Sequence, residues 1–216
     1  MGSEMCIRDR VHTDPLEVLK PNIHVELPIR SETKDFLTRL SQKLEVPLEP
    51  KQEWIQKCEA WKRDYPVVTR ERHYAEDGLA NAYCFMNELS KLAPEGLTIV
   101  STNGSACVVG GSAFLLKRDQ RFLLNSGAAS MGYDLPAAIG ACFAKGKAET
   151  YCLAGDGSIQ MNLQELQTIV FHKLPIKIFV INNAGYHSMR QTQNNLFQGI
   201  TNVGVGPETG DLSFPD

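Results

Sequence analysis

The sequence of 216 residues has no apolar stretch that approaches the roughly 20 residues needed to span a bilayer, and its N-terminus lacks the apolar core of a signal peptide. It also lacks a dense run of lysine and arginine, and its formal net charge is only −3. The charge pattern therefore gives no reason to expect nucleic acid or an anionic membrane as a partner. We accordingly expect a cytoplasmic protein.

Disulfides and a zinc site are not expected either. The six cysteines include no C-x-x-C pair, and several lie in apolar runs, where a thiol acts as a small core residue. What is present, 43% hydrophobic and 22% charged residues, is typical of a globular protein with a sizeable core. The length suits one full domain and a piece of another.

The two ends of the chain are interpreted separately from the fold. Residues 1–10 read MGSEMCIRDR, and part of this text resembles the translation of an adapter used in sequencing libraries, so we set it aside. Residues 199–216 end in DLSFPD, with no helix or strand pattern to close a domain. We therefore expect a truncated piece of a longer protein.

Residues 11–45 are expected to form the end of an earlier domain. Alternation of apolar and polar residues over 23–27 suits an edge strand. Ser31 is a candidate N-cap for the helix that follows. That helix is marked by apolar residues at helical spacing, namely Phe36, Leu37 and Leu40.

Residues 46–74 are interpreted as a linker. It contains a charged helix on which Trp54 and Trp61 stand seven residues apart. This spacing puts both rings on one face of a helix, so we predict packing anchors without a catalytic role.

Residues 75–216 are expected to form an α/β domain, a parallel sheet with helices on both faces that is incomplete at the C-terminus. A helical pattern comes first, and short apolar runs then alternate with small-residue loops and helices. Ligands of such sheets bind beyond the carboxyl ends of the strands, where the loops converge. The helical pattern runs through Leu79, Tyr83, Met86 and Leu89, and the four runs taken as strands are residues 97–101, 122–125, 150–154 and 176–181.

A metal and a diphosphate are predicted at one edge of this sheet. The third run leads into GDGS at residues 155–158, and the fourth ends in Asn182 and Asn183. A right-handed strand, helix and strand brings Asp156 and Asn183 to the same edge, where oxygen ligands suit magnesium and a diphosphate. The glycines allow close approach, and the helix that starts near Ser158 offers N–H groups. That helix is marked by Ile159, Leu163, Leu166 and Val170.

The pattern GDGS-x23-NN resembles the signature of the thiamine diphosphate enzymes, and residues 75–197 look closest to the acetolactate synthase branch. Residues 125–142, NSGAASMGYDLPAAIGAC, are similar to the family segment that holds the aminopyrimidine ring. The resemblance implies that Met131 is the apolar wedge that bends the cofactor. It implies cofactor contacts by Asn103, Gly104, Ser105, Ala129, Ser130, Met131, Gly155, Asp156, Gly157, Ser158, Asn183, Gly185 and Tyr186, and magnesium ligation by Asp156, Asn183 and the Gly185 carbonyl.

Departures from the family pattern bear on the reaction. Ser188 and Thr192 stand where many acetolactate synthases have Met and Trp, which implies a wider or more polar acceptor pocket. Met189 stands where simple 2-oxoacid decarboxylases carry a glutamate, so an acid that releases an aldehyde is missing. The resemblance thus implies decarboxylation of a pyruvate-like 2-oxoacid and ligation of the acyl unit to a carbonyl acceptor. His187 is assigned to proton transfer, with a hydrogen bond to a loop carbonyl as the alternative.

Two alternatives to a carboligase stay open, a non-oxidative decarboxylase of the same superfamily and an inactive cofactor-binding remnant. A dinucleotide-binding module is not favoured, because no G-x-G-x-x-G opens a helix after the first run. The resemblance implies that the catalytic glutamate lies on a more N-terminal domain, usually of a partner subunit. We therefore expect a homodimer or tetramer for the full-length protein, and an inactive chain here. FAD is possible, although these residues do not support it.

Overall fold

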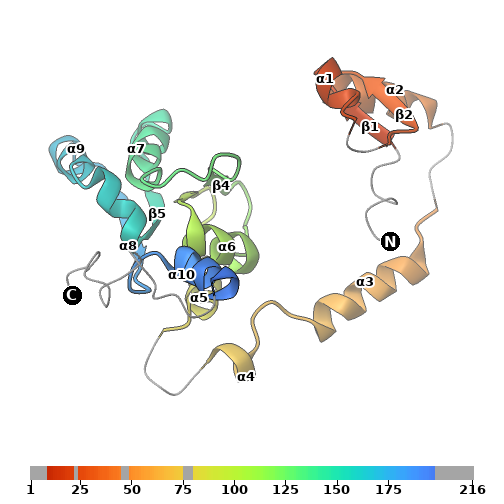
Figure 1. Ribbon diagram of the computed structural model, residues 1–216. Helices are drawn as coiled ribbons and strands as arrows, with labels where there is room; N and C mark the ends of the chain where they lie inside the picture. Colours follow the sequence, from red (N-terminus) through yellow and green to blue (C-terminus); the bar gives the residue numbers. More distant parts are fainter. Residues whose placement is uncertain (1–8, 22–23, 45–48, 75–79, 198–216) are drawn as a thin grey trace. The chain divides into compact units, whose positions relative to one another are not determined.

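We describe a computed structural model of the chain, which covers residues 9–21, 24–44, 49–74 and 80–197 (Figure 1). The chain divides into two compact units, Met1–Lys62 and Arg63–Asp216. The predictions made for residues 1–8, Ile23, residues 46–48, residues 75–79 and residues 199–216 lie outside the described residues. Among the helices described, none is long and apolar enough to cross a membrane.

The first unit contains a small parallel strand pair. Strand β1 (Asp9–His12) pairs with β2 (Leu27–Arg30), so β1 begins inside the segment that was set aside as adapter-like. The strand predicted over residues 23–27 was placed too early, because residues 24–26 precede β2 and only Leu27 belongs to it. Pro28 lies within β2, which is compatible with a strand that has a single neighbour.

Two helices accompany this pair. Helix α1 (Pro15–Val18) is capped by the Asp14 carboxylate, which accepts the Leu16 N–H at 2.8 Å. Helix α2 (Thr33–Lys43) has Glu32 at its N-cap position, so the Ser31 cap was wrong by one residue. An N-cap side chain accepts a helix N–H, whereas the Ser31 hydroxyl donates to the Glu32 carbonyl.

The tryptophan helix is α3 (Gln52–Asp64), and the short helix α4 (Arg70–His73) follows it. Trp54 and Trp61 pack on each other, with ring centroids 5.6 Å apart and planes at 89°. Both rings stay about half exposed, so the pair packs along the surface of its own helix.

A four-stranded parallel sheet forms the centre of the second unit, in the order β4-β3-β5-β6. All four predicted strands are confirmed, and each end lies within one residue of its predicted position. The bounds of β6 match the prediction at both ends. The strands are β3 (Thr98–Ser101), β4 (Arg121–Leu124), β5 (Thr150–Gly155) and β6 (Ile176–Ile181).

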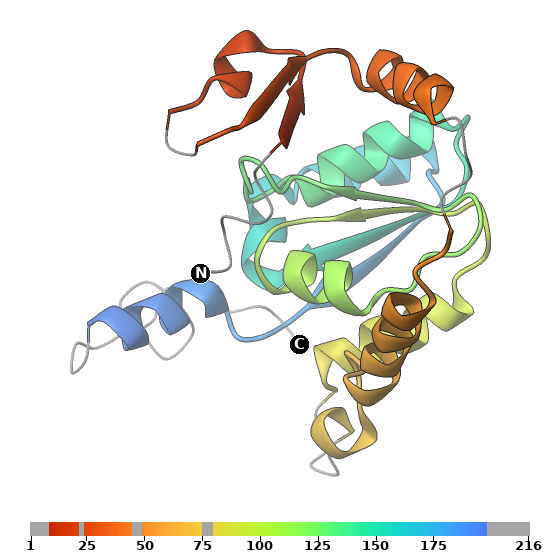
Figure 2. The same cartoon turned by 90° about the vertical axis from the view of Figure 1, so that its right-hand side faces the viewer.

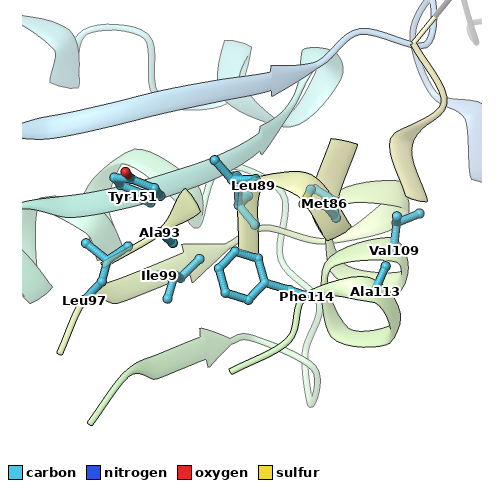
Figure 3. Close-up of a cluster of buried hydrophobic side chains, with 11 residues drawn as sticks. Met86, Leu89, Ala93, Leu97, Ile99, Val109, Ala113, Phe114 and Tyr151 are labelled. Atoms are coloured by element: carbon cyan, nitrogen blue, oxygen red, sulfur yellow. The ribbon is translucent and has the colours of Figure 1, made fainter. Parts of the chain in front are cut away.

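Helices cover both faces of this sheet, which confirms the predicted fold class. Ile99 and Leu153 point to one face and pack with α5 and α6, where Met86 and Phe114 complete a buried cluster (Figure 3). Alternate residues such as Cys152 point to the other face and pack with α7 and α9. Figure 2 shows α6 (light green) and α7 (blue-green) on opposite sides of the strands. The helices are α5 (Ala82–Leu92), α6 (Gly104–Ala113), α7 (Asp134–Ala144), α8 (Asp156–Ile159), α9 (Glu165–His172) and α10 (His187–Leu196).

The helix predicted after the GDGS motif is broken. Helix α8 lasts one turn, a 3-10 helix follows at Gln160–Asn162, and α9 starts at Glu165. The predicted apolar face was therefore wrong beyond Ile159, because the break changes the rotation of the chain and buries Ile169 instead. Within the break, the Asn162 side chain donates to the Gly132 carbonyl at 2.7 Å. The exposed positions are Leu163, Leu166 and Val170.

Candidate functional site

The strand order creates a crevice between β3 and β5. Chain connections leave β3 toward β4 on one side and β5 toward β6 on the other, so the loops that follow these two strands diverge. Ligands of open parallel sheets bind at such a switch point. A pocket lined by residues of the loops that follow both strands lies there.

The pocket brings together most of the residues that the sequence predicted. Every predicted cofactor-binding residue lines it except Ala129, Ser130 and Asp156, and His187 lines it as well. Ala106 and Ile181 also line the pocket and were not predicted. Their signal was positional only, since Ala106 lies in the first turn after a strand loop and Ile181 ends a strand.

Asp156 is buried between Gly155 and Gly157, which line the pocket, and its carboxylate accepts hydrogen bonds from the turns on both sides. Its Oδ1 accepts the Gly157 N–H at 2.8 Å, and its Oδ2 accepts the N–H groups of Asn183 at 3.2 Å and Gly185 at 2.7 Å. These bonds join the loop after β5 to the loop after β6, as expected from the pairing of Gly155 with Ile181. A lone pair of Oδ1 is not used by these three bonds.

Asn183 presents an oxygen without a partner. Its Nδ2 donates to the Ser105 hydroxyl at 3.0 Å, which fixes the orientation of the amide. Its Oδ1 is buried and has no hydrogen-bond partner among the described residues. A buried polar atom of this kind is costly unless a ligand satisfies it. The third predicted ligand, the Gly185 carbonyl, accepts the His187 N–H at 2.9 Å and keeps one lone pair.

The donor set therefore suits a hard cation. It consists of a carboxylate, an amide oxygen and a carbonyl, the oxygen ligands that magnesium prefers. No group of three or more His, Cys, Asp and Glu side chains able to hold a metal occurs in the described part of the chain.

The turn between β6 and α10 holds this ligand set in place. Asn182 accepts the Ala184 N–H at 3.2 Å, so Asn182 shapes the turn. Ala184 has a φ of +61°, a conformation that non-glycine residues rarely adopt. The Arg190 guanidinium on α10 donates to the Asn183 carbonyl at 2.6 Å and to the Ala184 carbonyl. No sequence pattern predicted this contact of Arg190.

The loop after β4 supplies Met131, whose partly buried side chain lines the pocket. Ala129 adopts a φ of +51°, and its carbonyl accepts the Asn103 side-chain N–H at 3.1 Å. Asn103 stands at the N-cap position of α6 but makes no capping bond, so it links two loops. Ala129 and Ser130 are exposed beside the pocket.

Ser158 does not offer its hydroxyl to the pocket. The Ser158 Oγ donates to Asp134 Oδ2 at 2.7 Å, accepts the Gly132 N–H at 2.8 Å and lies 2.5 Å from Thr102 Oγ1. All of its hydrogen-bonding capacity is used within the protein. Thr102 and Asp134 were missed in the sequence because neither has a local motif that reveals a contact across the sheet.

A parallel sheet with an oxygen-lined pocket at its switch point defines a cofactor-binding α/β domain. Residues 102–213 match the family described as thiamine pyrophosphate enzyme, C-terminal TPP binding domain, and the chain belongs to this family of thiamine pyrophosphate-dependent enzymes.

Curated relatives are acetolactate synthases. The chain is 33% identical over 192 residues to the acetolactate synthase large subunit of Cyanidium caldarium, which covers 87% of this chain and 32% of the relative. It is 30% identical over 173 residues to the acetolactate synthase isozyme 1 large subunit of Escherichia coli (strain K12), which covers 80% of this chain and 30% of the relative. The chain thus spans about a third of the length of the curated relatives it matches.

Proposed function

We propose that the pocket binds the diphosphate of thiamine diphosphate through a magnesium ion held by Asp156, Asn183 and the Gly185 carbonyl. The observation that carries the proposal is the buried Asn183 Oδ1, which has no partner among the described residues and belongs to a residue whose backbone N–H donates to the Asp156 carboxylate. A cation there satisfies this oxygen and offsets the negative charge of both the carboxylate and the diphosphate.

The loops of this chain bind and orient the two ends of the cofactor. Gly155, Gly157, Ser105 and Met131 all line the pocket. We assign the first three to the diphosphate and Met131 to the ring end of the cofactor. Because α8 has only one turn, we assign less of the phosphate binding to a helix dipole than a continuous helix would supply. Bound cofactor supplies the electron sink for loss of carbon dioxide, and the protein supplies position and exclusion of water.

We propose further that the parent protein is a carboligase that uses a pyruvate-like 2-oxoacid and a carbonyl acceptor, as a homodimer or tetramer. Tyr186 and His187 are the titratable side chains among the residues that line the pocket, and no carboxylate is among them. Met189 is one of the lining residues. An acyl unit bound beside Met189 meets no carboxylic acid among the lining residues that could protonate it, which favours transfer to an acceptor.

Calorimetry tests the cofactor proposal. Thiamine diphosphate is expected to bind the chain in the presence of Mg²⁺ and to lose most of its affinity when EDTA replaces the metal, because the diphosphate contacts the protein through the ion. Inorganic diphosphate should show the same dependence. Binding that does not change on removal of Mg²⁺ would contradict the assigned ligand set.

Product analysis tests the carboligase proposal. The full-length protein supplied with pyruvate is expected to form mainly a carbon–carbon ligation product, and Met189→Glu is expected to raise the share of free acetaldehyde, because the new acid lines the pocket. Met161→Glu is the matched control, since Met161 and Met189 are exposed to 49% and 48% and Met161 does not line the pocket. Acetaldehyde as the main product of the unmodified protein would favour the decarboxylase alternative.

A further inference from the structure

A buried carboxylate lies next to the pocket without lining it. Asp134, the first residue of α7, has no exposed surface. Its Oδ1 accepts the Leu135 N–H at 2.9 Å, and its Oδ2 accepts the Ser158 hydroxyl at 2.7 Å. Burial of a carboxylate is costly even when it is hydrogen-bonded, and an apolar residue would serve the core at least as well. Packing alone therefore does not account for Asp134.

The carboxylate fixes the direction of a hydrogen-bond network. Ser158 has one hydroxyl proton, and an ionised carboxylate only accepts. When Ser158 donates to Asp134, its oxygen accepts from Gly132 N–H at 2.8 Å and from Thr102 Oγ1 at 2.5 Å, a shorter contact than the 3.3 Å from Thr102 Oγ1 to Asn103 Oδ1. The network therefore joins the end of β3, the loop after β4, the start of α7 and the turn after β5.

Two of these segments contribute residues that line the pocket. Gly132 directly follows Met131 in the loop of residues 125–133, here named the Met131 loop. Ser158 closes the turn of residues 155–158, here named the GDGS turn. The bond between Gly132 N–H and Ser158 Oγ connects the two segments, and Asp134 holds Ser158 in the rotamer that makes this bond.

We propose that Asp134 is a positioning residue that holds the Met131 loop at a fixed distance from the GDGS turn. The inference rests on the proposed function, because this distance matters only if one ligand contacts both segments. A ligand that contacts the GDGS turn alone, such as inorganic diphosphate, does not depend on the position of the Met131 loop. Loss of Asp134 then lowers the affinity for thiamine diphosphate selectively, since the Met131 loop and the GDGS turn are no longer held at a fixed distance.

The test compares two ligands across matched variants of the whole chain. Calorimetry gives the Kd of thiamine diphosphate and the Kd of inorganic diphosphate, both with Mg²⁺. Asp134→Ala is expected to raise the Kd of thiamine diphosphate about tenfold or more and to change the Kd of inorganic diphosphate by no more than about twofold. Leu135→Ala is the control, because Leu135 is the next residue, is equally buried and contributes only its backbone N–H, which alanine keeps, to the network. Although Leu135→Ala destabilises the core, it should leave the ratio of the two Kd values unchanged.

Asp134→Asn serves as the conservative variant. An asparagine can accept the Leu135 N–H with its oxygen and donate to Ser158 Oγ with its nitrogen, and Ser158 can then donate to Thr102. The geometry is kept with the directions reversed, so we expect recovery of most of the lost affinity. In a Ser158→Ala background, Asp134→Ala should lower the affinity for thiamine diphosphate no further, because Asp134 acts on the Met131 loop only through Ser158.

Each outcome bears on a separate claim. Binding of both ligands by the unmodified chain, with the ratio changed only in Asp134→Ala, supports the positioning role. An unchanged ratio in Asp134→Ala, or an equal change in Leu135→Ala, overturns that role and leaves the proposed function intact. If the unmodified chain binds neither ligand at millimolar concentration, the proposed function fails and this inference fails with it.

Discussion

Replacement of Asp156 by asparagine is expected to raise the Kd of magnesium thiamine diphosphate about 100-fold or more, beyond the 10- to 100-fold typical of residues that only support a metal ligand. The charge that attracts the cation is lost. In addition, both carboxylate oxygens accept backbone N–H groups, from Gly157 on one side and from Asn183 and Gly185 on the other. An asparagine has a single oxygen, so its amide nitrogen must face at least one of these donors.

The measurement is calorimetry of the variant against Asp119→Asn. Asp119 is an exposed aspartate with a φ of +57°, a conformation that asparagine also tolerates, so this control changes the same charge without touching the pocket. Asp156→Asn is also expected to lower the free energy of unfolding by about 1–3 kcal/mol, because a buried donor loses its acceptor. Unchanged affinity in Asp156→Asn, with the fold intact, would rule out this residue as a magnesium ligand.

The sheet and the proximity of Asp156 to Asn183 were predictable because both depend on short-range pattern and chain topology. Apolar runs bounded by Gly, Ser and Asn give the strands, and a parallel arrangement brings successive carboxyl ends to one edge. The residues that follow β5 and β6 therefore lie close together because of the backbone topology, independently of their side chains. Because Gly155 pairs with Ile181, Asp156 and Asn183 each follow within two residues of the same pair and come into contact.

The break after Ile159 was not predictable in the same way. Apolar residues continue at a helical spacing through it, and no proline or glycine interrupts residues 159–170. What separates the two helices includes a contact from outside the segment, the bond of Asn162 to the Gly132 carbonyl. A period counted along the sequence assumes one continuous rotation, so a tertiary contact that resets the rotation moves the buried position to Ile169.

The side-chain ties around the pocket share this origin. Each of these bonds joins a side chain to a residue outside its own helical turn. Arg190 and Asn103 donate to the backbone carbonyls of Asn183 and Ala129, and Asp134 accepts the Ser158 hydroxyl. Backbone partners leave no trace in residue type, so no motif pairs with them. Asn103 shows this most clearly, because its N-cap position is compatible with a local role that the structure does not use.

Replacement of Gly132 by alanine is expected both to destabilise the second unit and to lower the affinity for thiamine diphosphate. Gly132 has a φ of +76°, and a Cβ built there lies 2.6 Å from Asn162 Nδ2 and 2.7 Å from Met161 Cβ. The left-handed conformation alone costs an alanine about 1–2 kcal/mol. Relief of the two close contacts must move the Met161 backbone or the loop, at a further cost of about 1–3 kcal/mol.

Gly96→Ala separates these two contributions. Gly96 has nearly the same φ, +71°, and a Cβ built there meets nothing within 4 Å. Denaturant unfolding followed by circular dichroism should therefore show a small loss of stability for Gly96→Ala and a larger one for Gly132→Ala. Cofactor affinity should fall only in Gly132→Ala, because Gly132 lies between Met131 and the bond to Ser158.

The Asn162 contact can be removed without the other. In Gly132→Ala combined with Asn162→Ala, the clash with the Asn162 side chain disappears, whereas the Met161 Cβ stays 2.7 Å from the new methyl group unless the backbone moves. Stability is therefore expected to stay low in the double variant. Full recovery would mean that the Asn162 side chain alone sets the limit at this position, and the Met131 loop would then tolerate a left-handed alanine as well as the Gly96 turn does.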